Sequence, residues 1–166
     1  MNVMARNEIV VGLDTSPSAK AALSWAAQYA RETGFVLRAI HVLDWPVGDP
    51  AHRAPVVNGL VSLPEHGTDS AFATIMRREL EAVDPLPEWS VQFAEGEAGR
   101  ELVRHSTEAK LLVIGTREHV GLERLMAGSV SHYCLSHAAC PVVAVPVIEE
   151  AGPVPGRATV RGEKRD

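Results

Sequence analysis

The sequence predicts one α/β domain: a doubly wound, five-stranded parallel sheet with helices on both faces. Short β-branched apolar runs alternate with longer segments of helical periodicity along most of the chain, and this alternation is typical of parallel sheets whose connections are helices. The apolar runs are nearly continuous, as expected of strands that are buried on both faces. At 166 residues the chain has room for one such domain, with a core that folds without metal or disulfide support.

The first strand and the first helix follow from local signals. Residues 8–13 (EIVVGL) form the first buried strand, and Ser16 and Pro17 then fit the N-cap and the first position of a helix. Alanine and leucine residues recur at helical spacing after Pro17, which predicts close packing on the sheet. Gly34 ends this helix, because glycine readily takes the left-handed conformation that closes a helix.

The rest of the chain repeats the alternation, apart from a surface excursion rich in proline and glycine that we expect over residues 44–64. The remaining strands are expected at about residues 35–43, 89–93, 111–114 and 142–145. The remaining helices are expected at about residues 72–83, 98–106 and 129–138. The result is a Rossmann-like single domain over residues 1–147, followed by a tail at residues 148–166 whose composition predicts disorder.

Charge and composition exclude several classes of function. The net charge is −5 and the isoelectric point is near 5.8, and no basic run follows a nucleic-acid backbone, so we expect no nucleic-acid partner. No apolar window reaches the roughly 18–20 residues of a membrane span, and residues 1–7 lack the order of a signal peptide. We therefore expect a cytoplasmic protein without a membrane partner, in which Cys134 and Cys140 are reduced and buried.

The segment over residues 114–131 carries the pattern of a phosphate site. Ligands of a doubly wound sheet bind beyond the carboxyl ends of the strands, where the winding direction reverses. Glycines 115, 121 and 128 lie in a loop that leads into the predicted helix at Ser129. Such a loop presents backbone amides and a helix N-terminus to an anion. On residue types alone, Gly128 and Ser129 are equally well explained as a turn and an N-cap.

Three segments resemble the universal stress protein family. Residues 9–17 (IVVGLDTSP) look like the first strand and turn of that family, residues 41–44 (HVLD) like the end of its second strand, and residues 140–143 (CPVV) like the start of its last strand. The resemblance spans residues 8–147. It implies a five-stranded parallel sheet and a dimer that often forms through the last strand, which agrees with an edge strand at residues 142–145 bounded by prolines.

The loop resembles the nucleotide motif of the ATP-binding members of this family. That motif is a glycine, two residues, a second glycine, nine residues, and a third glycine followed by Ser or Thr. Gly115, Gly128 and Ser129 match it, whereas Glu118 stands in the place of the second glycine.

The resemblance also implies roles for individual residues. Asp14 would lie near the ribose and adenine, the Val42 backbone would bond the adenine edge, and Gly115 would lie at the ribose and phosphates. The predicted nucleotide-binding residues are Leu13, Asp14, Val42, Ile114, Gly115, Arg117, Glu118, Gly128, Ser129, Val130 and Ser131. The implied function is regulation through bound ATP or a related adenine nucleotide in a homodimer, with slow or no hydrolysis and an unknown protein partner.

Glu118 leaves an alternative open. Its carboxylate would repel a triphosphate, unless Arg117 and Arg124 offset its charge or the carboxylate joins a Mg²⁺ ion held on the phosphates. A third possibility is a side chain turned to solvent. The alternative function is a dimeric interaction module of the same fold that has lost nucleotide binding.

No other pattern indicates an enzyme. Neither GxSxG nor GxxxxGK[ST] occurs, so we assign no catalytic residue. His132 and His137 are five residues apart on a helix and do not share a face as a metal-binding pair would, and His41 and His137 are better explained as packed, hydrogen-bonded residues. The solvated face of a helix accounts for Glu97, Glu101 and Glu108.

Overall fold

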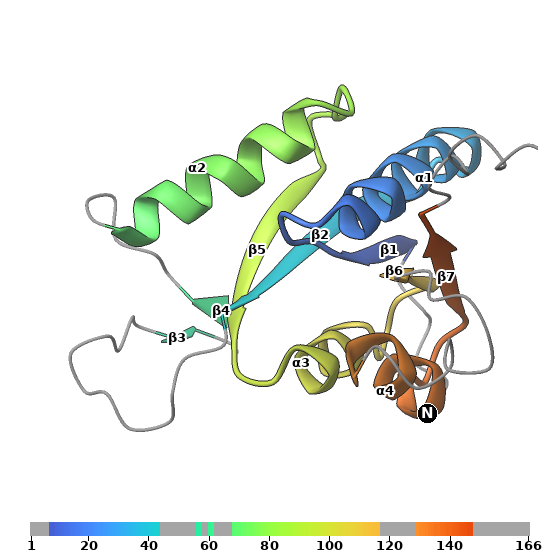
Figure 1. Ribbon diagram of the computed structural model, residues 1–166. Helices are drawn as coiled ribbons and strands as arrows, with labels where there is room; N and C mark the ends of the chain where they lie inside the picture. Colours follow the sequence, from blue (N-terminus) through green and yellow to red (C-terminus); the bar gives the residue numbers. More distant parts are fainter. Residues whose placement is uncertain (1–6, 44–55, 58–59, 62–67, 117–128, 148–166) are drawn as a thin grey trace, which may run out of the picture.

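Five parallel strands form one sheet in the order β5-β2-β1-β6-β7 in the computed structural model (Figure 1). The structure describes residues 7–43, 56–57, 60–61, 68–116 and 129–147. The strands of the sheet are β1 Glu8–Gly12, β2 Val36–Leu43, β5 Ser90–Glu95, β6 Leu111–Thr116 and β7 Val142–Pro146. The helices are α1 Pro17–Thr33, α2 Thr68–Glu81, α3 Ala98–His105 and α4 Ser129–His137.

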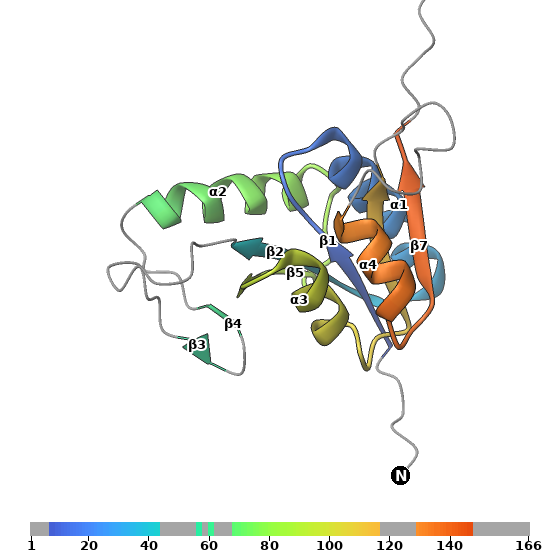
Figure 2. The same ribbon diagram turned by 60° about the horizontal axis from the view of Figure 1, so that its bottom comes forward.

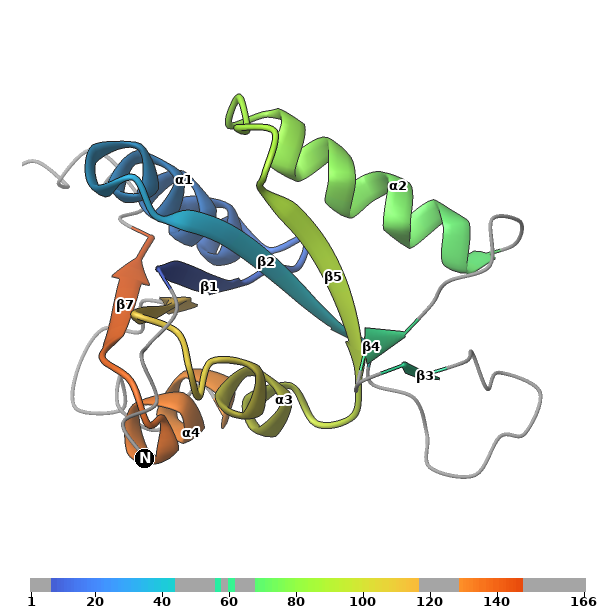
Figure 3. The ribbon, with the colours of Figure 1, turned by 180° about the vertical axis from the view of Figure 1, so that it is seen from behind.

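The helices cover both faces of the sheet, so the predicted fold class is confirmed. Helices α1 and α2 lie on one face and α3 and α4 on the other, as the views from the front and from behind agree (Figures 1 and 3). Each face has its own apolar cluster of buried residues, one with α1 and α2 and the other with α3 and α4. Figure 2 shows α3 and α4 side by side on their face.

The excursion predicted after β2 contains one regular feature among its described residues. Strands β3, Val56–Val57, and β4, Leu60–Val61, pair antiparallel as a separate two-stranded sheet. Strand β4 lies beside β5 (Figure 3). The remainder of residues 44–64 and the tail predicted over residues 148–166 lie outside the described residues.

Helix α1 begins and ends as the sequence predicts. The Ser16 hydroxyl accepts a hydrogen bond from the Ala19 amide at 3.2 Å, with Pro17 at the first helical position. At the other end Gly34 has φ 72°, in the left-handed region, and its N–H donates to the Ala30 carbonyl at 2.9 Å. Both ends are therefore capped by residues whose chemistry fits them.

Helix α2 has the predicted periodicity, but its apolar stripe is wider than its contact with the sheet. Ala73, Met76 and Leu80 are buried, whereas Phe72 is 47% exposed and Ile75 39% exposed. Since helical spacing brings both kinds of residue to one side of the helix, sequence periodicity does not separate the buried part of a stripe from its margin.

The amino ends of the strands are held together by one guanidinium. Arg38 of β2 pairs with Glu8 of β1 at 2.6 Å, and the two side chains are 13% and 16% exposed. Arg38 also donates to the Gln92 side chain of β5 at 3.0 Å and to the His105 carbonyl of α3 at 2.8 Å. Because these bonds satisfy the partly buried charge from three elements, they fix the amino edge of the sheet.

Within the described ranges, none of the helices has the length and apolar character needed to cross a membrane.

The two cysteines differ in burial, and only half of their predicted burial is confirmed. Cys134 on α4 is fully buried in the cluster between the sheet and α3 and α4, whereas Cys140 is partly exposed. Burial raises the pKa of the Cys134 thiol to about 11, with smaller contributions from Cys140 and Glu97. A thiol with so high a pKa carries almost no thiolate near neutral pH.

We therefore predict that iodoacetamide modifies Cys140 before Cys134 in the folded protein at pH 8, with Cys134 reacting at least tenfold more slowly, an order-of-magnitude figure that follows from its burial and low thiolate fraction. Peptide mass spectrometry after timed quenching measures both rates, and unfolding in urea should bring them together. Equal rates in the folded protein would contradict the burial described for Cys134.

Candidate functional site

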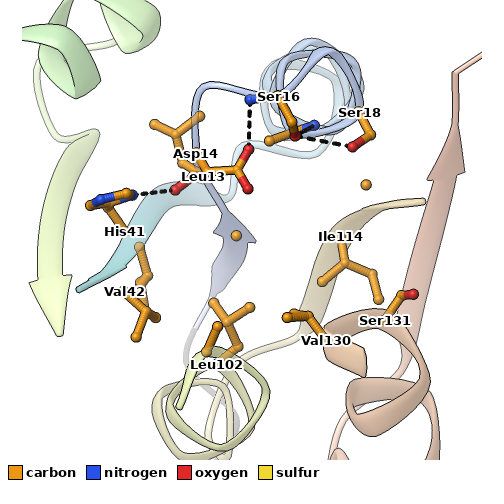
Figure 4. Close-up of a pocket in the computed structure, with 15 residues that line it drawn as sticks. Leu13, Asp14, Ser16, Ser18, His41, Val42, Leu102, Ile114, Val130 and Ser131 are labelled. Carbon is orange, nitrogen blue, oxygen red and sulfur yellow. Dashed lines mark hydrogen bonds between the residues drawn. The ribbon is translucent and has the colours of Figure 1, made fainter. Parts of the chain in front are cut away.

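The strand order reverses at the pair β1 and β6, and a pocket lies at the carboxyl ends of these strands. From β1 the chain crosses to β2 on one side, and from β6 it continues to β7 on the other. This divergence leaves a crevice, which is where ligands bind in doubly wound sheets. The crevice contains a pocket with a volume of about 230 Å³ (Figure 4). Its described lining is Gly12, Leu13, Asp14, Ser16, Ser18, Ala19, Ile40, His41, Val42, Ala98, Leu102, Ile114, Gly115, Val130 and Ser131.

The turn from β1 into α1 is held by its own polar side chains. Asp14 accepts a hydrogen bond from the Ser16 amide through one carboxylate oxygen at 2.7 Å. The Ser16 hydroxyl caps α1 and lies 3.1 Å from the hydroxyl of Ser18 (Figure 4). Asp14 is exposed, and its second carboxylate oxygen has no hydrogen-bond partner among the described residues. With respect to the described residues, that oxygen can accept a hydrogen bond from a hydroxyl group of a ligand.

Strand β2 presents a backbone edge to the same pocket. Residues of a parallel strand turn their N–H and C=O groups alternately to the two neighbouring strands. Ile40 accepts from the Leu13 amide at 2.9 Å, so it faces β1, whereas Leu43 accepts from the Gly96 amide and faces β5. Val42 therefore faces the side of β1, but the pairing of β1 with β2 ends at Gly12 and Ile40. Among the described residues, the Val42 amide and carbonyl thus face the pocket and not a strand.

Three helices begin at this pocket. Ser16, Ser18 and Ala19 belong to the start of α1, Ala98 is the first residue of α3, and Val130 and Ser131 lie in the first turn of α4. Amides at a helix N-terminus carry partial positive charge and attract anions. No lysine or arginine occurs in the described lining. Among the described residues, helix amides and hydroxyl groups are the donors that would stabilise an anion in this part of the pocket.

Gly115 is required by a close approach of two segments of backbone. A Cβ atom on Gly115 would lie 2.3 Å from both the carbonyl carbon and oxygen of Ser18, and 2.8 Å from the Ala19 nitrogen. These are backbone atoms in the first turn of α1, so they cannot move as a flexible side chain would. Glycine therefore allows β6 to pack directly under the start of α1, which brings the two sides of the pocket together.

The structure brings most of the predicted binding residues to one place. Seven of them line the cavity: Leu13, Asp14, Val42, Ile114, Gly115, Val130 and Ser131. Arg117, Glu118 and Gly128 lie outside the described residues, and Ser129 is described only as the first residue of α4. The binding roles of these residues remain predictions.

Sequence reasoning missed the other eight residues of the described lining. They are Gly12, Ser16, Ser18, Ala19, Ile40, His41, Ala98 and Leu102. Ser16 was interpreted only as a helix cap and His41 only as a packed residue, although each lies next to a strand end. Their position at the carboxyl edge is the signal that identifies them.

For side chains outside the pocket, the prediction for Glu101 is wrong and the prediction for His137 is confirmed in part. Glu101 is not on a solvated face: its side chain is 16% exposed and pairs with Arg104. His137 is packed and hydrogen-bonded as predicted, since its ring stacks on Tyr133 at 4.1 Å and its Nδ1 lies 3.0 Å from the Tyr133 carbonyl, but its side chain is exposed. In the described part of the chain, no group of three or more His, Cys, Asp or Glu side chains is arranged to hold a metal ion.

The fold and the pocket define a doubly wound α/β protein with an anion-compatible site at its switch point. The profile of the universal stress protein family matches residues 5–146. Universal stress protein YxiE of Bacillus subtilis is 29% identical over 149 residues, which cover 84% of this chain and 98% of the relative. Universal stress protein MJ0531 of Methanocaldococcus jannaschii is 30% identical over 149 residues, covering 83% of this chain and 81% of the relative. The chain belongs to the universal stress protein family.

Solved structures agree with the fold. A universal stress protein in complex with cAMP aligns with a TM-score of 0.58 at 20% identity, covering 85% of this chain and 97% of the other. A family member from Arabidopsis thaliana with AMP bound aligns with a TM-score of 0.55 at 16% identity, covering 89% of this chain and 97% of the other.

The approach of Gly115 to α1 makes a specific prediction. Gly115→Ala should lower the free energy of unfolding by about 1–3 kcal/mol, the usual cost of forcing an extra methyl group into a packed core. Gly12→Ala is the matched control, because its added Cβ would meet the flexible Leu102 side chain at 3.0 Å and not backbone. Urea unfolding of both variants measures the difference, and an equal loss in the two variants would contradict the account of Gly115.

Proposed function

We propose that this protein binds an adenine nucleotide, ATP or a close relative, at the carboxyl edge of the sheet and acts as a regulatory protein of the cytoplasm. The observation that carries the proposal is the arrangement of one pocket: the open Val42 backbone edge faces three helix N-termini across the switch point. A base edge pairs well with a backbone amide and carbonyl, and phosphates suit helix N-termini.

Asp14 and the known structures of relatives support the nucleoside part. The second carboxylate oxygen of Asp14 can accept from a ribose hydroxyl. The relatives bound to cAMP and to AMP carry adenine nucleotides on the same fold. We extend that ligand class to this chain.

Binding without rapid turnover is part of the proposal. Enzymes that transfer phosphoryl groups place positive charge against the phosphates in the transition state. The described lining supplies amides, hydroxyls and one carboxylate, Asp14, and it contains no lysine or arginine. The described part of the site therefore favours a bound nucleotide that alters the protein surface over one that is hydrolysed quickly.

The first test is calorimetric titration with ATP and with adenosine. Wild-type protein should bind ATP, and Gly128→Val should weaken ATP binding at least tenfold while circular dichroism stays unchanged, because a branched side chain at a phosphate loop removes the space that an anion needs. Adenosine, which has no phosphate, should be affected less. Unaltered ATP affinity in Gly128→Val would remove Gly128 from the site.

Glu118 favours a second function, the dimeric interaction module without nucleotide, because it replaces a glycine of the ATP motif. The same titration separates the two proposals. Complete absence of ATP and adenosine binding by the wild-type protein, with or without Mg²⁺, favours the interaction module.

We further propose a homodimer that pairs through β7. This strand is at the end of the strand order, so one of its edges has no partner among the described strands, and its residues Val142 to Val145 are only partly buried. An open apolar edge strand invites pairing with another strand, and a second copy offers a self-complementary partner.

Val143→Lys should shift the protein from dimer toward monomer at low micromolar concentration, because a charged side chain opposes the pairing of apolar edges. Ala71→Lys, on the exposed face of α2, adds the same charge elsewhere and should leave the mass unchanged. Light scattering gives the mass, and circular dichroism verifies the fold of both variants. A Val143→Lys protein that is folded and still dimeric would exclude this interface.

A further inference from the structure

His41 connects β2 to the turn that carries Asp14. Its Nδ1 lies 2.8 Å from the Leu13 carbonyl oxygen (Figure 4). A carbonyl oxygen only accepts hydrogen bonds, so the proton of this bond belongs to Nδ1. Leu13 is 3% exposed, and its amide donates to the Ile40 carbonyl at 2.9 Å. Both backbone groups of Leu13 are therefore bound to β2, one by the backbone of Ile40 and the other by the side chain of His41.

Two aromatic rings fix the orientation of the imidazole. Phe93 of β5 meets it edge to face, with centroids 6.0 Å apart and an interplanar angle of 77°. Phe72 of α2 is nearly parallel to it, with centroids 6.3 Å apart and an angle of 15°. These contacts limit rotation of the ring, so the direction of the Nδ1 proton is set by packing. Although Phe72 is largely exposed on α2, its ring stacks on the His41 imidazole of β2.

The bond connects two groups that face the pocket. On one side, Leu13 precedes Asp14, whose carboxylate is held in turn by the Ser16 amide at 2.7 Å. On the other side, His41 precedes Val42, whose backbone edge is open to the pocket. The hydrogen bond from His41 to Leu13 thus links the residue before Val42 to the residue before Asp14. Together with the bond from the Leu13 amide to the Ile40 carbonyl, it holds β2 and the Asp14 turn to each other beyond the last ladder pair, Gly12 with Ile40.

We propose that His41 is a positioning residue for the nucleoside part of the ligand. Its Nδ1–H bond holds Asp14 and the Val42 backbone at a fixed separation, so that one purine ribonucleoside can contact both. This inference rests on the proposed function and adds a residue that acts through Leu13 without touching the ligand's phosphates. Its effect should therefore be the same for adenosine and for ATP.

Two substitutions separate positioning from packing. His41→Phe keeps an aromatic ring between Phe72 and Phe93 but cannot donate to Leu13. His41→Asn loses most of the ring packing, but its side-chain amide can donate from about the place of Nδ1. We expect adenosine and ATP to bind about tenfold more weakly to His41→Phe, the scale of one lost hydrogen bond, and within about threefold of wild type to His41→Asn. Thermal stability should follow the opposite order, with His41→Asn the less stable variant.

If His41 had a purely structural role, nucleotide affinity would follow thermal stability. The inference is overturned if His41→Phe binds as tightly as wild type, or if His41→Asn binds more weakly than His41→Phe. Amide hydrogen exchange gives a second readout that needs no nucleotide. Leu13 should exchange faster in His41→Phe relative to Val11 in the middle of β1, and His41→Asn should restore the ratio. An unchanged ratio in His41→Phe also overturns the inference. If the wild-type protein binds neither adenosine nor ATP, the proposed function fails, and the inference fails with it as a statement about ligand binding.

Discussion

The contact between the Gly115 backbone and the first turn of α1 is the constraint on which the site depends. Strand β6 can lie under α1 only because Gly115 has no Cβ, which would be 2.3 Å from the Ser18 carbonyl. The contact fixes the start of α1 against β6, and therefore also fixes Ser16 and the Asp14 turn relative to the opposite wall of the pocket. At the amino edge Arg38 holds β1, β2, β5 and α3 together. The proposed ligand site lies at the opposite, carboxyl edge of the sheet.

The sequence was sufficient for the fold, because local chemistry and global topology agree in it. Ser16, Pro17 and Gly34 mark the two ends of α1, and continuous apolar strands require helices on both faces. Strand ends converge in a doubly wound sheet, and this rule pointed to Asp14 and Gly115 in the pocket, whereas the resemblance to the family supplied Leu13, Val42, Ile114, Val130 and Ser131. It could not assign Gly115 to the packing of α1, because that contact joins segments almost a hundred residues apart. It also could not separate Phe72 from the buried face of α2, since both satisfy the same helical period.

The described pocket lining offers a ligand both positive potential and hydrogen-bonding groups. Three helix N-termini supply positive potential without a basic side chain in the described lining, while Asp14 places one carboxylate near the start of α1. A ligand with a hydroxyl-rich part for Asp14, a base edge for Val42 and an anion for the helices satisfies all of these groups. A simple anion would satisfy only the helices, and it would meet the repulsion of Asp14. This difference is the reason to propose a nucleotide and not free phosphate as the ligand.

Amide chemical-shift mapping during titration with AMP tests the central claim most directly, because it reports both binding and place. The account predicts the largest shifts at the carboxyl edge, at Leu13, Val42 and Ser131. Glu8, Val36 and Lys110, at the amino ends of the strands, should change little. The absence of shifts at millimolar AMP, or shifts confined to the amino edge, would contradict the assignment of the nucleotide site to the switch point.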